Sequence, residues 1–464
     1  RTPDKREVGS SSLLKPTMNF NVGGLNMKKK QKDILVIGFA LFAMFFGAGN
    51  LIFPPYLGVL SGTSWTVGFT GFIIADVGLA LLAILASAKC DGDINRVIVR
   101  SGKRLSLVLA TAIMVCLGPL LAIPRTGATT FEMGMQPIFN GFNPVVFSIL
   151  FFGLTLVLTI KPSKVVDIIG QYLTPVLLVA LIVLIIKGII SPLGDLSQAA
   201  KIDGVFAEGI SQGYQTMDPL GALALSAVVI LSLGQKGYTE QYQKIKLTLQ
   251  SGMVAAVALI IIYGGLTFLG FTVAGQFVGV DLKNINQTAL IVSITEQLLG
   301  QPGKVVLAMI VGLACLTTSI GLTSATAQYF TKISKGRIKY ETIVVIVCVF
   351  SAVVSNFGVS TIISFSSPIL SIIYPATIVL VLLTLFGDNI HNDNIFKGAT
   401  YMALIVSVLT VVDSMGINVD FIHYLPFDSI GFNWIIPAIV GGVIGKFIPF
   451  NKSQDYDKNL EDIL

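Results

Sequence analysis

Two glycines and an asparagine interrupt an apolar segment that would otherwise form one membrane helix. They belong to the motif Phe46-Gly47-Ala48-Gly49-Asn50-Leu51-Ile52-Phe53-Pro54-Pro55, inside a run from Ile34 to Ala75 without a charged residue. Glycine lets a helix unwind, and irregular backbone at membrane depth is tolerated only where protein buries it or it lines a polar cavity. A half-helix starting near Leu51 would offer unpaired N–H groups to a carboxylate, such as that of an amino acid. The alternative is a kinked helix whose small residues serve packing. The candidate ligand-binding residues are Gly47, Ala48, Gly49 and Asn50.

A second interruption lies in Tyr214-Gln215-Thr216-Met217-Asp218-Pro219. Proline, and the restriction it places on the residue before it, disfavour a continuous helix. A carboxylate at membrane depth is costly and usually functional. We therefore expect Asp218 to neutralise a substrate ammonium or to help hold a cation, or else to cap the helix that starts at Pro219. The candidates here are Thr216, Met217 and Asp218.

A third candidate site lies midway through a later apolar run. Thr317 and Thr318 follow Ala314 by three and four residues, so all three share one helix face. A carbonyl and two hydroxyls supply the hard oxygen ligands that suit a small alkali cation. The alternative is that the hydroxyls bond back to carbonyls four residues earlier in their own helix.

Three further charges fall in or beside apolar runs: Asp76, Arg125 and Glu132. Ions at membrane depth usually face the protein interior and find partners. We expect Asp76 and Arg125 to form a structural ion pair.

Composition excludes a soluble protein. Of 464 residues, 53% are hydrophobic and only 12% are charged, against about 25% charged in soluble domains, and the mean hydropathy is +0.82. The net charge of +6 does not indicate a nucleic-acid partner, because Lys and Arg lie in short loops between apolar runs. The four cysteines are isolated and lack metal-binding spacing, so they are expected to pack as small apolar residues. The fold class is therefore an all-α polytopic membrane protein.

Twelve ranges are long enough to cross a bilayer: 33–60, 65–88, 104–130, 143–160, 164–190, 204–234, 249–275, 303–330, 341–357, 361–386, 397–416 and 430–449. With the N-terminus inside, Lys and Arg concentrate in the inner connecting segments, which predicts that both termini are cytoplasmic. Residues 1–26 are polar and precede Met27-Lys28-Lys29-Lys30. We expect them to be disordered or a non-native extension, and 450–464 to be a cytoplasmic tail.

The two interrupted ranges, the first near 47–50 and the sixth near 216–219, are five spans apart. A repeat of five spans places its second copy upside down, which is typical of secondary transporters with inverted repeats. This predicts a first repeat over 27–190, a second over 204–386, and two further helices within 397–449.

From Met27 onward the chain resembles the bacterial branched-chain amino acid transport system II carriers. Three motifs carry this resemblance: the first motif extended to include Phe45, the second extended to include Gly213, and Ile123-Pro124-Arg125-Thr126. That family belongs to the amino acid–polyamine–organocation group. The resemblance implies cation symport of leucine, isoleucine and valine, and a LeuT-type 5+5 inverted repeat with broken helices 1 and 6. One departure is Pro219, where the family pattern has no proline.

Carried over by motif, the resemblance implies roles for single residues. The amides of Ala48 and Gly49 would bind the substrate carboxylate, and Asn50 and Thr216 would bridge the substrate and a second cation. The sodium site would combine two carbonyls of the first helix with the third candidate group, giving Ala43, Phe46, Ala314, Thr317 and Thr318.

The sequence thus predicts a sodium-coupled importer of branched-chain amino acids in the bacterial cytoplasmic membrane. Phe46 and Met217 would contribute to an apolar pocket for the side chain. Proton symport or exchange on the same fold is one alternative, with Asp218 as the titrating group. A membrane enzyme and a channel are others, although the apolar core contains no histidine and no catalytic cluster. The oligomeric state stays open; Gly441-Gly442-x-x-Gly445 would permit close helix packing.

Overall fold

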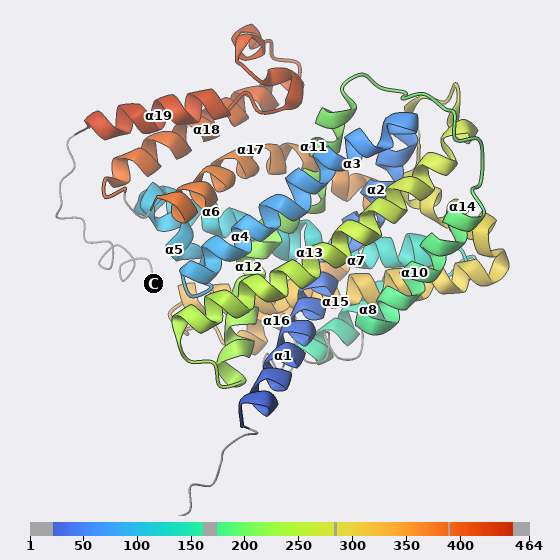
Figure 1. The fold of residues 1–464 in the computed structure, drawn as a ribbon, viewed down its shortest axis with the longest axis horizontal. Helices are drawn as coiled ribbons and strands as arrows, with labels where there is room; N and C mark the ends of the chain where they lie inside the picture. Colours follow the sequence, from blue (N-terminus) through green and yellow to red (C-terminus); the bar gives the residue numbers. More distant parts are fainter. Residues whose placement is uncertain (1–21, 161–173, 283–284, 388–389, 449–464) are drawn as a thin grey trace, which may run out of the picture.

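The computed structural model is a bundle of helices (Figure 1) and describes residues 22–160, 174–282, 285–387 and 390–448. Within these ranges the chain forms helices and loops and no strand. Eight of the described helical segments are long and apolar enough to cross a membrane, and three shorter apolar helices accompany them. The protein is therefore an all-helical, multi-pass membrane protein, as the composition predicts.

The first predicted span consists of two helices. Helix α1 (Val22–Phe45) ends before Gly47, whose extended backbone (φ −115°, ψ −153°) separates it from α2 (Ala48–Ser61). The break therefore lies at residues 46–47, and the prediction of an interruption near 47–50 is corrected, because Asn50 already lies in the first turn of α2. Of residues 1–26, expected to be disordered or a non-native extension, 22–26 are helical, and 1–21 lie outside the described residues.

The third predicted span is also interrupted, although it was expected to be continuous. Helix α6 (Lys103–Val115) leads into a wide turn at Cys116–Leu120, and α7 (Ala122–Thr130) follows. Gly118 leaves helical geometry with ψ −123°. Pro119, next to it, has no N–H to continue a helix. This interruption brings Arg125 to the centre of the bundle.

The remaining helices are α3 (Trp65–Ile73), α4 (Leu79–Lys89), α5 (Ile94–Ile98), α8 (Pro144–Thr159), α10 (Thr174–Ile190), α11 (Val205–Thr216), α12 (Asp218–Gln235), α13 (Gln241–Thr272), α14 (Gln287–Leu299), α15 (Gln301–Ile333), α16 (Tyr340–Val354), α17 (Val359–Phe386), α18 (Asp393–Ser414) and α19 (Ile435–Phe447). Every predicted range contains helix, although 164–173 of the fifth lies outside the described residues. How many helices cross the bilayer remains a prediction. Helix α14 was not predicted; Asn286 caps it by accepting hydrogen bonds from the amides of Thr288 and Ala289.

Glycines allow α2 and α13 to touch backbone to backbone. A Cβ on Gly58 would collide with the Thr267 carbonyl, and one on Gly270 would collide with the Pro55 carbonyl. This contact sets α13 directly beside the broken first span, and with it the fully buried Tyr263.

Helices α18 and α19 lie side by side at the edge of the bundle (Figure 1). The glycine face of α19 packs on α18 of the same chain: a Cβ on Gly441 would meet the Gly398 carbonyl, and one on Gly445 would meet the Asn394 carbonyl. These glycines therefore serve packing within the chain.

Candidate functional site

The two helix breaks face each other at the centre of the bundle. Asn50, in the first turn of α2, donates from its side-chain amide to Asp218 Oδ2 at 2.8 Å. Asp218 begins α12 directly after Met217, whose positive φ of 70° turns the chain away from α11. Pro219 stands in the first turn of α12, where a missing N–H is tolerated. The proline that departs from the family pattern therefore fits the break.

Tyr263 joins Asn50 and Asp218 in a buried polar group. Its hydroxyl donates to Asp218 Oδ2 at 3.1 Å and accepts a hydrogen bond from the Asn50 amide. Asn50 Oδ1 in turn accepts from the amide of Gly47 at 3.1 Å, which secures the extended residue of the break. Tyr263 was not among the predicted site residues; its signal in the sequence is a hydroxyl-bearing side chain inside an apolar span.

The expected ion pair between Asp76 and Arg125 is wrong. Asp76 Oδ1 accepts a hydrogen bond from the Thr216 hydroxyl at 2.7 Å. Arg125 instead donates to two backbone carbonyls at the C-terminal end of α11, from Nη1 to Gln215 at 2.9 Å and from Nη2 to Thr216 at 3.3 Å. The C-terminal end of a helix carries partial negative charge, which attracts a cation.

A cavity of about 20 Å³ lies between the breaks. That volume holds about one water molecule. Among its lining residues are Gly47, Ala48, Asn50, Arg125, Thr216, Met217 and Asp218. Gly49, the remaining predicted ligand residue, lies beside it: a Cβ there would stand 2.8 Å from Arg125 Nη2.

Four of the five predicted cation ligands come together beside this cavity. Thr317 donates from its hydroxyl to the carbonyls of Ala43 at 2.7 Å and Ala314 at 2.9 Å, and Thr318 donates to Ala43 at 3.3 Å. The ring of Phe46 stacks on Phe42 and Tyr263, and its amide donates to the Phe42 carbonyl at 2.7 Å; among the described hydrogen bonds of Thr317 and Thr318, none goes to the Phe46 carbonyl. The bond from Thr317 to Ala314 stays within α15, as in the alternative interpretation, but reaches the carbonyl three residues earlier rather than four, and it coexists with the bond to α1.

Glu132 lies away from the breaks. Its carboxylate accepts hydrogen bonds from the Val359 amide at 2.8 Å and from the Thr288 hydroxyl at 3.1 Å. It thereby ties the end of the third span to α17 and α14, at the wall of a separate cavity of about 700 Å³.

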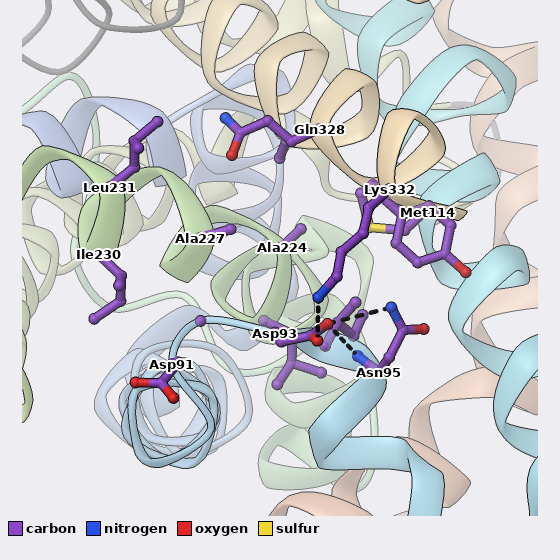
Figure 2. A pocket seen from close by; sticks show the side chains of 15 residues that line it. Asp91, Asp93, Asn95, Met114, Ala224, Ala227, Ile230, Leu231, Gln328 and Lys332 are labelled. Atoms are coloured by element: carbon purple, nitrogen blue, oxygen red, sulfur yellow. Dashed lines mark hydrogen bonds and ion pairs between the residues drawn. The ribbon is translucent and has the colours of Figure 1, made fainter. Parts of the chain in front are cut away.

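A third cavity, of about 350 Å³, is shown in Figure 2. Helices α12 and α15 line both this cavity and the central one. Ala224 and Ala325 line this cavity, and Leu225 and Leu322, on the same two helices, line the central cavity. Lys332 reaches across it to Asp93 at 2.6 Å. By the predicted topology this cavity faces the cytoplasm.

Facing helix breaks around a small polar cavity are the architecture of a secondary transporter. Solved structures of LeuT-fold transporters share the fold. Mhp1, a nucleobase-cation-symport-1 family transporter, in a closed conformation, aligns with a TM-score of 0.58 at 14% identity, over 93% of this chain and 96% of its own. MhsT in complex with L-phenylalanine aligns with a TM-score of 0.52 at 17% identity, over 89% and 98%.

Residues 30–452 match the family of branched-chain amino acid transport proteins, and the chain belongs to that family. It is 36% identical to the branched-chain amino acid permease BraB of Bacillus subtilis, over 89% of this chain and 95% of the relative. The relatives are transporters, so the membrane-enzyme alternative is set aside.

Proposed function

We propose that this protein imports leucine, isoleucine and valine by sodium symport with alternating access. It would act in the bacterial cytoplasmic membrane, with both termini cytoplasmic and inverted repeats at 27–190 and 204–386. The observation that carries the sodium assignment is the convergence of the Thr317 and Thr318 hydroxyls on the Ala43 carbonyl, next to the break in the first span.

The substrate's charged groups would meet complementary groups at the two breaks. The first amides of α2, at Ala48 and Gly49, have no carbonyl partner within their own helix and suit a carboxylate. The Asp218 carboxylate, on the opposite half-helix, suits an ammonium. Bridging roles for Asn50 and Thr216 are supported by their hydrogen bonds to Asp218 and Asp76.

The apolar part of the cavity suits an aliphatic side chain. Met44, Leu117, Met217, Leu225 and Leu322 line it. Such a surface discriminates one methylene by only about 1–3 kcal/mol, so we expect all three branched-chain amino acids to be accepted. The cavity of about 20 Å³ is far smaller than any of them. Binding therefore requires the helices around it to separate, as alternating access demands.

Sodium is favoured over protons because the hydroxyls and carbonyls of the cation group do not titrate in the physiological range. Proton coupling is the second candidate. It is supported by two buried aspartates, Asp76 and Asp218. The Thr216 hydroxyl donates to the Asp76 carboxylate at 2.7 Å and accepts from the backbone amide of Asp218 at 3.4 Å.

The deciding experiment is uptake of labelled isoleucine into proteoliposomes under an inward Na⁺, K⁺ or H⁺ gradient, for wild type and Thr317→Ala/Thr318→Ala. Uptake driven by Na⁺ and abolished in the double variant is the expected result. Uptake driven by H⁺ alone would move the coupling to the carboxyl groups. If no gradient drives isoleucine uptake, the substrate assignment is wrong.

A further inference from the structure

Arg125 is a buried cation whose hydrogen-bonding capacity is only partly used. Its side chain comes from α7, just after the interruption of the third span, and the residue is 3% exposed. Within the part of the chain that the structure describes, its Nε is buried and has no hydrogen-bond partner. A buried donor without a partner carries a desolvation cost, so the open donor calls for an acceptor.

The geometry of the guanidinium leaves one edge for that acceptor. Nη1 and Nη2 bind the Gln215 and Thr216 carbonyls at the end of α11. Because a guanidinium has five N–H donors in a fixed fork, the edge formed by Nε and one Nη keeps two donors available. Such an edge matches the two oxygens of a carboxylate.

The same guanidinium lies over the start of α2. A Cβ on Gly49 would stand 2.8 Å from Nη2 and 2.9 Å from the Phe53 ring, so the absence of a side chain at this position leaves room for the guanidinium against the first turn of α2. Arg125 and Ala48 line the same cavity. The N-terminal amides of α2 and the positive charge of Arg125 therefore converge on one place.

We propose that Arg125 binds the α-carboxylate of the transported amino acid, together with the first amides of α2. This inference rests on the proposed function. Both charges of a zwitterion would find a partner at the cavity: Arg125 lies against the first turn of α2 while also binding the end of α11, and Asp218, which also lines the cavity, offers a carboxylate to an ammonium. A zwitterion is then held by opposite charges at its two polar groups, with its side chain on the apolar lining.

The test compares ligands with and without the carboxylate. Competition against labelled isoleucine gives the affinities of L-isoleucine and of 2-methylbutylamine, the same molecule without its carboxylate, for purified wild type, Arg125→Gln and Arg125→Lys. The matched control is Arg104→Gln, an exposed arginine at the start of the same span. We expect wild type and the control to prefer isoleucine by roughly 100-fold. Arg125→Gln should reduce the preference to less than tenfold by weakening isoleucine binding, and Arg125→Lys should lie between.

The outcomes separate recognition from folding. A structural clamp would weaken both ligands alike, so an unchanged preference in Arg125→Gln overturns the proposal. If the Arg125 variants do not fold, Gly49→Ala provides the second measurement, because its added Cβ crowds Arg125 Nη2 and the Phe53 ring without removing the charge. The preference must then fall in Gly49→Ala, and full retention overturns the proposal. Absence of isoleucine binding in wild type would instead refute the proposed function itself.

Discussion

The hydroxyl of Thr317 on α15 donates a hydrogen bond of 2.7 Å to the carbonyl of Ala43, two residues before the end of α1. Thr318, the next residue, contacts the same carbonyl at 3.3 Å. The hydroxyl proton satisfies this carbonyl; a bound cation would take the proton's place, and both oxygens would turn to it. The contact thus links cation binding to the position of α1.

This link predicts the effect of Thr317→Val, which removes the hydroxyl and keeps the volume. We expect the Na⁺ concentration for half-maximal isoleucine uptake to rise at least about tenfold, since one ligand contributing more than about 1.4 kcal/mol is lost. Thr317→Ser should retain sodium dependence. The control is Thr400→Val, since Thr400 is equally buried but donates only to the Phe396 carbonyl of its own helix among the described residues. An unchanged sodium dependence in Thr317→Val would remove Thr317 from the cation site.

Two buried tyrosines predict opposite responses to loss of a hydroxyl. Tyr263→Phe removes a partner of both Asn50 and Asp218, and we expect it to lower the free energy of unfolding by about 1 kcal/mol and to slow isoleucine uptake. Tyr374, stacked on Tyr214 with ring centroids 4.6 Å apart, has a buried hydroxyl without a hydrogen-bond partner among the described residues. Tyr374→Phe should therefore be neutral or stabilising. Both variants are compared with wild type by their free energy of unfolding in mixed micelles and by their rate of isoleucine uptake. If the two variants are destabilised equally, the Tyr263 hydroxyl contributes no more than the unpartnered hydroxyl of Tyr374.

The helix breaks could be predicted because glycine, proline and a charge within an apolar run are local signals. Gly118-Pro119 was such a signal and was overlooked, because the run around it is long enough for a continuous span. Helix α14 was missed since its 13 residues lie in a linker between two long spans and carry no strong apolar run.

The partners of buried polar groups could not be predicted in the same way. Asp76 and Arg125 both face the interior, as membrane depth requires. Their partners depend on how each helix is rotated, and rotation is a tertiary property. The same holds for Tyr263, which becomes part of the site only because glycines bring α13 against α2.

His423 predicts a local pH dependence in the segment between α18 and α19. Hydrogen bonds to Asp428 and Asp413, at 3.0 and 3.1 Å, raise the pKa of this exposed imidazole above its usual value. The stabilisation is therefore complete below the unfolded pKa of about 6.5 and is lost as the pH rises through the raised value. Amide hydrogen exchange in 413–428, corrected for intrinsic rates, should be slower at pH 6 than at pH 8.

His423→Gln should abolish that difference, while the control His391→Gln, at the chain's other histidine, should keep it. A pH difference that persists in His423→Gln would assign the effect to another group.

We expect the ion pair across the third cavity to help hold that cavity closed on the side of the protein predicted to face the cytoplasm. Lys332 on α15 binds Asp93, whose side chain is only 11% exposed. Asp93 also accepts from the Asn95 amide at 3.0 Å and caps α5, so Lys332→Gln is a cleaner change than a charge swap. Losing the pair should favour the open cavity by about 0.5–1 kcal/mol. A cysteine placed at Gln328, which lines the cavity, should then react with a thiol reagent roughly two- to fivefold faster.

The labelling rates of Gln328→Cys are compared with and without Lys332→Gln, after subtraction of labelling at the four native cysteines. Arg96→Gln is the matched control, because Arg96 and Asp91 form a pair of 3.0 Å in the same region in which both side chains are nearly half exposed, whereas Asp93 is mostly buried. Pairs between exposed side chains contribute little. If Lys332→Gln and Arg96→Gln label at the same rate, the pair does not hold the cavity closed. Faster labelling in Lys332→Gln alone, reversed by saturating isoleucine with Na⁺, would connect this closure to occupancy of the central site.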